Sequence, residues 1–236
     1  MTMREEAVLM VTGASSGIGA ALVKVLAAPG RVLHLQGRDS QRLRKVAEIV
    51  ESRGATPRCH ALDFTDPNAV EKAARTLAES IPFLDALVHS AGVVSLGTVE
   101  ESDVAELDRQ WLVNLRAPFV LTAALTPALA SAEGQVIFVN SGAGLRASAC
   151  WSQYASTKFG LKAIADAYRD EVADRGVRVS TVYPGRTATP MQAEVHRFEG
   201  REYDESAHAR PDDVAGSILH ALEMPRSAVV PEIMVR

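Results

Sequence analysis

The stretch AVLMVTGASSGIGAALVKVL, residues 7–26, combines an apolar run, a glycine-rich turn and a second apolar segment with helical spacing. A continuous apolar run such as AVLMVT (7–12) is typical of a strand buried on both faces, as in a parallel sheet. The segment ALVKVLAA (21–28) has the periodicity of a helix, and Pro29–Gly30 ends it. The stretch therefore predicts a strand, a turn and a helix, the opening unit of a parallel α/β sheet.

The glycines of this turn have the spacing G-x3-G-x-G. Gly13 allows the tight turn, Gly17 lets a phosphate approach the backbone, and Gly19 lets the helix pack closely on the strand. The helix N-terminus offers free N–H groups and a favourable dipole to a pyrophosphate. A purely structural turn is the alternative, but the position between strand and helix favours a dinucleotide site.

The rest of the chain repeats the alternation of short apolar runs with helical patterns. After residues 7–12, the predicted strands are 31–36, 58–62, 85–90, 135–140, 177–183 and 228–235. Helical patterns at 41–52 and 69–80 lie between them, the second begun by Asp66 as a cap with Pro67 in its first turn. We expect one α/β domain over residues 1–236, a doubly wound parallel sheet of the Rossmann type with about seven strands and helices on both faces.

Composition limits the partners and the compartment. The chain of 236 residues is 47% hydrophobic and 23% charged, as is ordinary for a globular domain, and its net charge of −4 argues against nucleic acid as a partner. Cys59 and Cys150 give no disulfide framework, which fits a reducing compartment. Glu5 and Glu6 interrupt the region where a signal peptide is apolar, and no continuous apolar run reaches the ~18 residues of a membrane span. We therefore expect a cytoplasmic protein with no membrane partner.

The end of the second predicted strand bears on the choice of cofactor. An acidic residue there binds the ribose of NAD, whereas this sequence has Gln36, Gly37 and Arg38. The planar guanidinium of Arg38 fits a 2′-phosphate, and Arg42 follows one turn later. The pattern predicts NADP(H) in preference to NAD(H); the alternative is a charged, solvated helix start.

The segment WSQYASTKFG, residues 151–160, places Tyr154 and Lys158 on one face of a predicted helix. The pKa of a free tyrosine, about 10, is too high for a base at neutral pH. A neighbouring ammonium group and the positive nicotinamide of an oxidised cofactor both favour the phenolate. We therefore expect Lys158 to lower the pKa of Tyr154, which becomes a candidate acid and base.

Seven segments, in order, resemble the motifs of the short-chain dehydrogenase/reductase family in its compact, single-domain form. They are TGASSGIG (12–19), LDFTD (62–66), HSAG (89–92), VNLRAPF (113–119), VNSGAG (139–144), YASTK (154–158) and YPGRTAT (183–189). The resemblance covers about residues 7–234. Two positions depart from the family: Ser90 replaces the second asparagine of the motif after strand four, and Asn140 stands where a first serine is usual.

The resemblance implies a catalytic set made of Asn114, Ser141, Tyr154 and Lys158. Tyr154 would transfer a proton while hydride moves between the nicotinamide and a carbonyl carbon, and Ser141 would hydrogen-bond the oxygen. Lys158 would also bind the nicotinamide ribose, and Asn114 would hold a water that links Lys158 to solvent. The implied cofactor contacts, with Asp63 at the adenine, are Gly13, Ser15, Ser16, Gly17, Ile18, Gly19, Arg38, Asp63, Ser90, Ala91, Gly92, Tyr154, Lys158, Pro184, Gly185, Thr187 and Thr189.

Substrate specificity is expected from the loops at 92–99, 142–153 and 186–210, the last of which is predicted to be a mobile lid. Within these loops Arg186 either meets an acidic substrate or forms a surface salt bridge, and Trp151 either lines the pocket or anchors its helix. The helices at about 101–131 and 152–174 are the pair that relatives use to dimerise, so a homodimer or homotetramer is expected.

The histidines show no metal-ligand spacing, and no metal is expected. Those in or beside strands are predicted to be packed, namely His34, His60 and His89. Those in polar or helical surroundings are predicted to be exposed, namely His196, His208 and His220.

Three functions remain compatible with these patterns. The first is an NADP-dependent alcohol dehydrogenase or carbonyl reductase acting on a small carbonyl or alcohol substrate, for which the catalytic set is complete. The second is an NADP-binding regulator of the same fold without turnover, against which intact Ser141, Tyr154 and Lys158 argue. The third is a nucleotide-sugar epimerase or dehydratase, which usually needs a larger substrate domain after strand six than this sequence provides.

Overall fold

The computed structural model describes residues 6–236, so Glu5 and the residues before it lie outside that range. Its strands are β1 (Val8–Thr12), β2 (Val32–Gly37), β3 (Thr56–Ala61), β4 (Ala86–His89), β5 (Gln135–Val139), β6 (Arg178–Pro184) and β7 (Glu232–Val235). Its α-helices are α1 (Gly17–Leu26), α2 (Ser40–Ser52), α3 (Pro67–Ser80), α4 (Val104–Trp111), α5 (Ala117–Ala132), α6 (Ser152–Glu171), α7 (Pro190–Phe198) and α8 (Pro211–Glu223).

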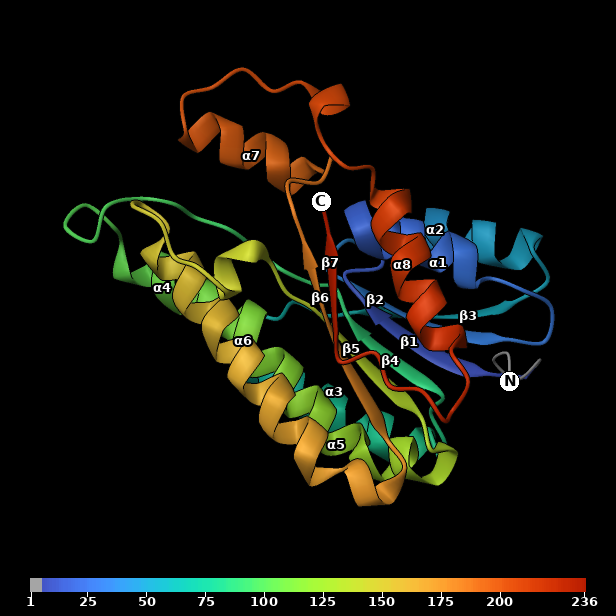
Figure 1. Ribbon diagram of the computed structural model, residues 1–236. Helices are drawn as coiled ribbons and strands as arrows, with labels where there is room; N and C mark the ends of the chain where they lie inside the picture. Colours follow the sequence, from blue (N-terminus) through green and yellow to red (C-terminus); the bar gives the residue numbers. More distant parts are fainter. Residues whose placement is uncertain (1–5) are drawn as a thin grey trace.

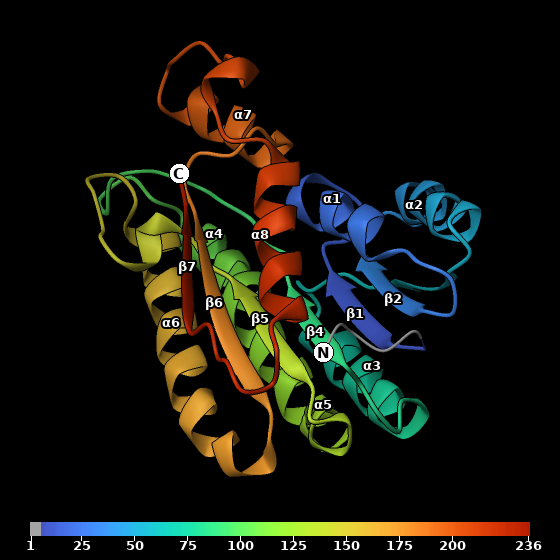
Figure 2. The ribbon, with the colours of Figure 1, turned by 45° about the vertical axis from the view of Figure 1, so that its right-hand side comes forward.

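The described strands form one sheet in the order β3-β2-β1-β4-β5-β6-β7, and every neighbouring pair is parallel. The helices α1, α2 and α8 cover one face, and α3, α4, α5 and α6 cover the other (Figures 1 and 2). This confirms the predicted doubly wound sheet. The strand order reverses between β1 and β4, which opens a crevice at the carboxyl ends of these strands.

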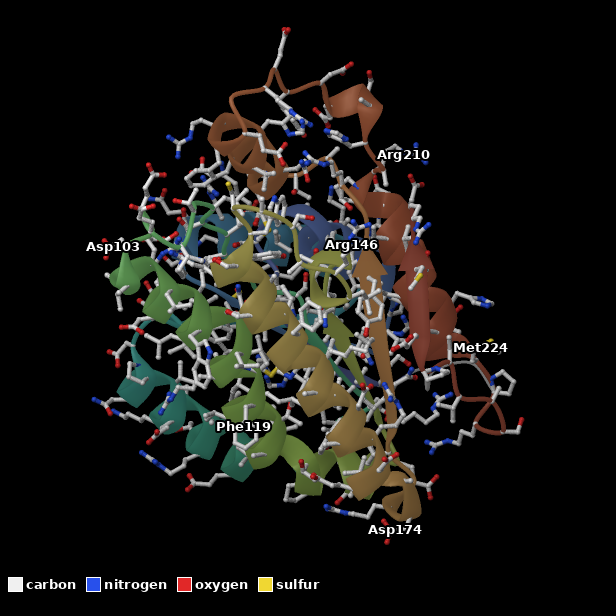
Figure 3. All side chains as sticks on the ribbon, turned by 60° about the vertical axis from the view of Figure 1, so that its left-hand side comes forward. Asp103, Phe119, Arg146, Asp174, Arg210 and Met224 are labelled. Carbon is white, nitrogen blue, oxygen red and sulfur yellow. The ribbon has the colours of Figure 1, made fainter. Side chains whose placement is uncertain are left out.

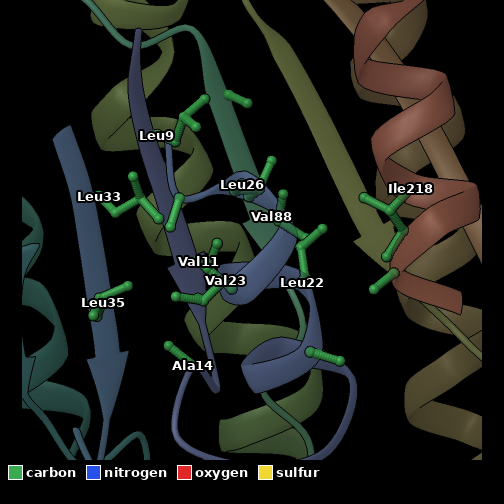
Figure 4. Packing of buried hydrophobic residues seen from close by; sticks show 14 of the residues in the cluster. Leu9, Val11, Ala14, Leu22, Val23, Leu26, Leu33, Leu35, Val88 and Ile218 are labelled. Carbon is green, nitrogen blue, oxygen red and sulfur yellow. The ribbon is translucent and has the colours of Figure 1, made fainter. Parts of the chain in front are cut away.

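The sheet separates two apolar cores. Leu9 of β1 lies in the core that contains Leu22 of α1 and Ile218 of α8 (Figure 4). Met10, the next residue of the strand, lies in the opposite core with Leu121 of α5. Because successive residues point to opposite faces and both faces are buried, the strands have continuous apolar sequences.

Two element ends show how local sequence sets the boundaries. The Asp66 carboxylate accepts hydrogen bonds from the backbone N–H groups of Asn68 and Ala69, at 3.0 and 2.9 Å, which confirms the predicted cap of α3. The strand β7 starts at Glu232, later than predicted, because Pro231 has no N–H to donate to the sheet. The Pro231 carbonyl still accepts from the Thr181 N–H at 2.9 Å.

The predicted helix over 101–131 consists of α4, a π-helical turn at Leu112–Arg116, and α5. By length and composition Val104–Ala132 is long and apolar enough to cross a membrane: an 18-residue window has a mean hydropathy of 1.4. The sequence analysis considered only uninterrupted apolar runs and so did not single out this segment. However, 56% of that window is buried inside the protein. The described contacts therefore make Val104–Ala132 a core helix that packs on α3.

Candidate active site

The glycine turn between β1 and α1 is shaped by close backbone contacts. Gly13 has a φ of +66°, and a side-chain carbon there would lie 2.8 Å from the Ala91 nitrogen. A side-chain carbon on Gly19 would lie 2.3 Å from the Gly13 carbonyl oxygen. Gly17 lies opposite Thr189. A side-chain carbon added to Gly17 would be 3.1 Å from Thr189 Cγ2. These contacts support the roles predicted for the glycines: a tight turn, an open backbone and close packing.

Two polar side chains that the sequence analysis missed hold this turn in place. Thr12 Oγ1 accepts hydrogen bonds from the N–H groups of Ser90 and Ala91, both at 3.1 Å, and so joins the ends of β1 and β4. Gln36 Oε1 accepts from the Gly13 N–H at 3.1 Å, while its Nε2 donates to the Leu62 carbonyl at 2.7 Å. The only sequence signal was a polar residue at the end of an apolar strand.

A cavity of about 440 Å³ opens beside the glycine turn. Its lining includes Ser15, Ser16 and Gly17 of the glycine turn, together with Arg38 and Arg42. The Ser16 side chain makes no capping bond, so no side-chain cap competes for the first N–H groups of α1. A free helix N-terminus and two guanidinium groups on one cavity fit a dinucleotide with an additional phosphate.

Gly37 belongs to the same wall for a steric reason. A side-chain carbon on Gly37 would lie 2.9 Å from Ser15 Oγ, so a larger residue would press on the glycine turn.

Asp63, the predicted adenine contact, does not line the cavity, whereas its neighbour Phe64 does. One Asp63 oxygen accepts from the N–H and the hydroxyl of Thr65, both at 2.9 Å. The adenine contact of Asp63 therefore remains a prediction.

A second cavity, of about 410 Å³, holds the predicted catalytic side chains Ser141, Tyr154 and Lys158. Both cavities are lined by the residues between them, namely Ile18, Ser90, Ala91, Gly92, Val94, Thr189 and Met191. The two cavities are thus adjoining parts of one cleft. Pro184, Gly185 and Thr187 line its second part, as predicted for cofactor contacts. Gly19 and Asn114 line neither part and support the walls from behind.

Tyr154 and Lys158 are both buried, with 6% and 4% of their surface exposed. Burial raises the pKa of Tyr154 to about 12, and a hydrogen bond with the Ser141 side chain acts against this shift. Burial also lowers the pKa of Lys158 to about 8. The Lys158 Nζ lies 5.7 Å from the centroid of the Tyr154 ring and donates to the Val139 carbonyl at 3.1 Å. The sequence analysis expected Lys158, together with an oxidised nicotinamide, to lower this pKa; in the protein chain alone, desolvation of the phenol is the larger effect and raises it.

Asn140 fixes the position of Ser141. Its Oδ1 accepts from the Ser141 N–H at 2.8 Å, and its Nδ2 donates to the Lys158 carbonyl at 3.0 Å. The Ser141 Oγ accepts from the Ala143 N–H at 3.1 Å. The residue that departs from the family at this position therefore joins the end of β5 to α6.

Asn114 lies in the π-helical turn, fully buried, at a point where α4, α5 and α6 meet. Its Nδ2 donates to the Val93 carbonyl at 2.9 Å and to Thr157 Oγ1 at 3.1 Å, and its Oδ1 accepts from the Val93 N–H at 2.8 Å. Asn114 Oδ1 and Lys158 Nζ both lie close to Gly92. A side-chain carbon added to Gly92 would be 3.5 Å from Asn114 Oδ1 and 4.0 Å from Lys158 Nζ. A water held by this side chain would have to donate to Oδ1, which accepts only the Val93 N–H among residues 6–236 and keeps its second lone pair.

The structure bears differently on the alternatives that the sequence left open for Arg186 and for Trp151. Arg186 forms an ion pair with Glu199, with 2.6 Å between Nη2 and Oε1, so the salt-bridge interpretation is confirmed. Trp151 does both things considered for it: it lines the second cavity and packs edge-on against Tyr154, with 5.9 Å between ring centroids. Sequence analysis missed Arg109, Glu194 and Arg146, which line the cleft from α4, α7 and the loop after β5.

The histidines are partly as predicted. His34 Nδ1 and His60 Nε2 are 2.9 Å apart in stacked rings, and His89 is buried against Thr122, so these three are packed. The prediction for His196 was wrong: it is buried against Tyr203 and His208 in the segment after β6. Within residues 6–236 no group of three or more metal-ligating side chains is found.

The segment 186–210 lies beyond the carboxyl edge of the sheet, where Figures 1 and 2 show α7 standing over the crevice. Its two ends are joined by hydrogen bonds from the Ala188 N–H to the Ala209 carbonyl, 2.8 Å, and from the Ala209 N–H to the Arg186 carbonyl, 3.1 Å. Met191 and Val195 of α7 point into the second cavity. The position is that of a lid, and its mobility remains a prediction.

With this arrangement described, the chain can be compared with known proteins. It matches the short chain dehydrogenase family over residues 7–200 and belongs to that family of oxidoreductases. An uncharacterized oxidoreductase of Staphylococcus saprophyticus is 30% identical, over 100% of this chain and 99% of its own. A short chain dehydrogenase of Escherichia coli complexed with NADPH is similar, with a TM-score of 0.88, 29% identity, and coverage of 99% of this chain and 98% of its own. An alcohol dehydrogenase of the archaeon Thermococcus sibiricus complexed with 5-hydroxy-NADP has a TM-score of 0.86 and 27% identity, over 98% of this chain and 96% of its own.

Proposed function

We propose that the protein is an NADP(H)-dependent oxidoreductase that moves hydride between the nicotinamide and a carbonyl compound or secondary alcohol. The observation that carries this proposal is the continuous cleft, with Ser141, Tyr154 and Lys158 at one end and the glycine turn with Arg38 at the other. Both ends lie at the carboxyl edge of one sheet. We therefore assign cofactor and substrate sites to a single domain.

NADP(H), when bound, supplies or accepts the hydride. In the reducing direction Tyr154 donates its proton to the substrate oxygen as the carbonyl carbon gains hydride, which yields an alcohol and NADP⁺. A pKa of about 12 keeps the phenol protonated near neutral pH, so the acid form is available. Ser141 hydrogen-bonds the oxygen while negative charge grows on it.

Lys158 acts after the proton has left Tyr154. Its ammonium group lies over the ring and stabilises the phenolate, and a water on Asn114 returns a proton from solvent. The same atoms run the oxidation in reverse, with the phenolate as base. In that direction the positive charge of the oxidised nicotinamide opposes the burial that raises the pKa of Tyr154.

Two observations support NADP(H) over NAD(H). Arg38 and Arg42 both line the first cavity, at the end of β2 where an acidic residue would select NAD. In addition, the similar proteins from E. coli and T. sibiricus were solved with NADPH and with an NADP derivative.

We further propose a cytoplasmic homodimer or homotetramer. Large apolar side chains are exposed on α4, α5 and α6, with 50% of Trp111, 56% of Phe119 and 44% of Phe159 accessible in the single chain. Cys59 and Cys150 are exposed and free, which suits a reducing compartment.

The test follows oxidation of NADPH and NADH with a panel of aldehydes and ketones, using wild-type protein and Tyr154→Phe. Loss of the proton donor is expected to lower kcat/KM with NADPH by about 100- to 10,000-fold. The matched control is Tyr168→Phe, because Tyr168 lies on the same helix, bonds Thr126 at 3.0 Å and lines neither cavity.

Other outcomes favour the rival functions. NADPH binding without turnover of any carbonyl, by wild type and Tyr154→Phe alike, would favour the regulator. Conversion of a nucleotide sugar with no net change in NADPH would favour the epimerase or dehydratase. A clear preference for NADH would contradict the role of Arg38.

A further inference from the structure

The charged side chains that line the second cavity are all positive. Among the described residues that line it, the ionisable side chains with a full charge are Arg146, Lys158 and Arg186, and none is Asp or Glu. A cleft lined by one sign of charge concentrates ligands of the opposite sign. The catalytic end of the cleft is therefore electropositive, although the chain as a whole has a net charge of −4.

Of these three cations, two already have partners. Lys158 donates to the Val139 carbonyl and lies over the Tyr154 ring. Arg186 is neutralised by Glu199 at 2.6 Å. No ion pair or side-chain hydrogen bond is found for Arg146 among residues 6–236, and its side chain is exposed. Arg146 is thus the exposed cation of this cavity that has neither an ion pair nor a side-chain hydrogen bond within residues 6–236.

The backbone that carries Arg146 is well defined. It lies five residues after Ser141, in a turn closed by bonds from the Gly144 N–H to the Ser141 carbonyl, 2.9 Å, and from the Arg146 N–H to the Gly142 carbonyl, 3.1 Å. The same loop is joined to residues 92–99 by the Gly97 N–H, which donates to the Cys150 carbonyl at 2.9 Å. Figure 3 shows Arg146 near the end of α6 that faces α7, far from Asp174 at the other end.

The same cavity also has an apolar lining around Tyr154. Val94, Tyr154 and Val195 form a small buried cluster, against which Trp151 and Met191 pack. A ligand in this part of the cleft therefore meets an apolar surface next to Tyr154 and the exposed guanidinium group of Arg146 on the same lining.

We propose that Arg146 selects carbonyl substrates that carry an anionic group, a carboxylate or a phosphate, beyond an apolar body. The planar guanidinium forms two parallel hydrogen bonds with such oxyanions. Ser141 and Tyr154 hold the carbonyl oxygen at the other end, so the substrate is bound at two points. This inference rests on the proposed function, which it deepens by naming a substrate class.

The test compares 4-carboxybenzaldehyde and 4-formylphenyl phosphate with the neutral methyl 4-formylbenzoate, each reduced with NADPH. The quantity measured is the ratio of kcat/KM for each anion to that for the ester. We expect Arg146→Gln to lower this ratio by about 10- to 100-fold, mainly through KM of the anion, as for loss of a hydrogen bond to a charged group. The two anions report whether carboxylate or phosphate is preferred.

Two variants serve as controls. Arg146→Lys keeps the charge without the planar fork and is expected to restore part of the ratio. Arg44→Gln removes one positive charge from an exposed site on α2 that lines neither cavity, and it should leave the ratio at the wild-type value. An equal ratio in wild type, Arg146→Gln and Arg44→Gln would overturn the proposal while leaving the carbonyl reductase function intact. An equally large loss of NADPH affinity in Arg146→Gln would also overturn it, since the cation would then bind the cofactor.

A binding measurement separates this inference from the proposed function if no aldehyde is reduced. Benzene-1,4-dicarboxylate is titrated calorimetrically into the protein saturated with NADP⁺. Binding by wild type that Arg146→Gln weakens at least tenfold, and Arg44→Gln does not, supports an anion site without turnover. Absence of binding by the wild type overturns the site.

Discussion

At Tyr154 and Lys158, burial favours the neutral form of both side chains. It raises the pKa of the phenol to about 12 and lowers that of the ammonium group to about 8. The phenolate–ammonium pair that the proposed mechanism uses is therefore not the resting state of the protein alone. Its formation depends on charge that arrives with the substrate or the cofactor, and this makes a protonated Tyr154 ready for reduction.

The lowered pKa of Lys158 has a consequence for stability. Between pH 8 and 10.5 the unfolded chain binds a proton at Lys158 that the folded protein has released, so the free energy of unfolding rises with pH. Over this window the wild type should gain about 3 kcal/mol relative to Lys158→Met, which has no titrating group. Urea unfolding of both proteins at several pH values measures the difference.

A difference that stays flat from pH 8 to 10.5 would show that Lys158 titrates alike in the folded and unfolded chains. Comparison with the variant is necessary because burial raises the pKa values of Tyr154, Tyr168 and Tyr183, and this lowers the stability of both proteins at higher pH. Their contribution cancels in the difference.

Arg38 is the residue on which the choice of cofactor depends. If its guanidinium binds the 2′-phosphate, Arg38→Gln should raise the dissociation constant of NADPH by about 10- to 100-fold and change that of NADH far less. Arg44→Gln, at an exposed arginine of α2 that lines neither cavity, is the charge-matched control. Fluorescence titration with both nucleotides tests this, and a parallel loss of NADH affinity would count against the phosphate contact.

Sequence alone identified the side chains that occupy recognisable short motifs. Ser141, Tyr154 and Lys158 were found in this way, and the structure brings them into one cavity. Thr12 and Arg146 were missed because their importance comes from contacts between segments far apart in the chain. The burial that raises the Tyr154 pKa in the chain alone was not foreseen either, since the spacing of two residues does not reveal how deeply they are buried.

At the scale of elements, the ends of β1 and β4 form one unit through Thr12. Its hydroxyl is the partner of two backbone N–H groups, so Thr12→Val removes that acceptor while keeping the shape of the side chain. We expect a loss of about 1–2 kcal/mol in the free energy of unfolding and weaker NADPH binding, because Ala91 also contacts the glycine turn.

Thr12→Ser is the control, because it keeps the hydroxyl and loses only a methyl group. Urea unfolding and NADPH titration are run on both variants. Thr12→Ser should retain the NADPH affinity that Thr12→Val loses. If both variants bind NADPH as the wild type does, the hydroxyl is not needed to position the turn.

Elements were predicted well where a local signal marks their ends. Asp66 and Pro67 are such local signals, and they predict the start of α3. The π-helical turn at Leu112–Arg116 has no such signal, because the buried bonds of Asn114 to Val93 and Thr157 involve other segments. The interruption of the predicted helix at Asn114 was therefore visible only in the folded chain.

At the scale of the whole molecule, the parallel direction of the strands and the helices on both faces of the sheet followed from the alternation of apolar runs with helical patterns. A strand such as β5, buried along its whole length, needs helices on both faces, which leaves few arrangements open. The segment 186–210 lacked such a pattern, and its packing of His196 against Tyr203 and His208 was not anticipated. Long-range contacts in irregular segments leave no periodic signal in the sequence.

The exposed apolar side chains on α5 and α6 lead to a prediction about assembly. Figure 3 shows Phe119 on the surface of α5, beside α6, which carries Phe159. If a second copy covers this face, Phe119→Glu with Phe159→Glu would bury two carboxylates at the interface, which costs several kcal/mol. Sedimentation velocity at micromolar concentration should show a dimer or tetramer for the wild type and a monomer for the double variant.

Val229→Glu, at an exposed valine before β7, is the control and should assemble as the wild type does. A monomeric wild type, or a double variant that still assembles, would place the interface elsewhere or remove it.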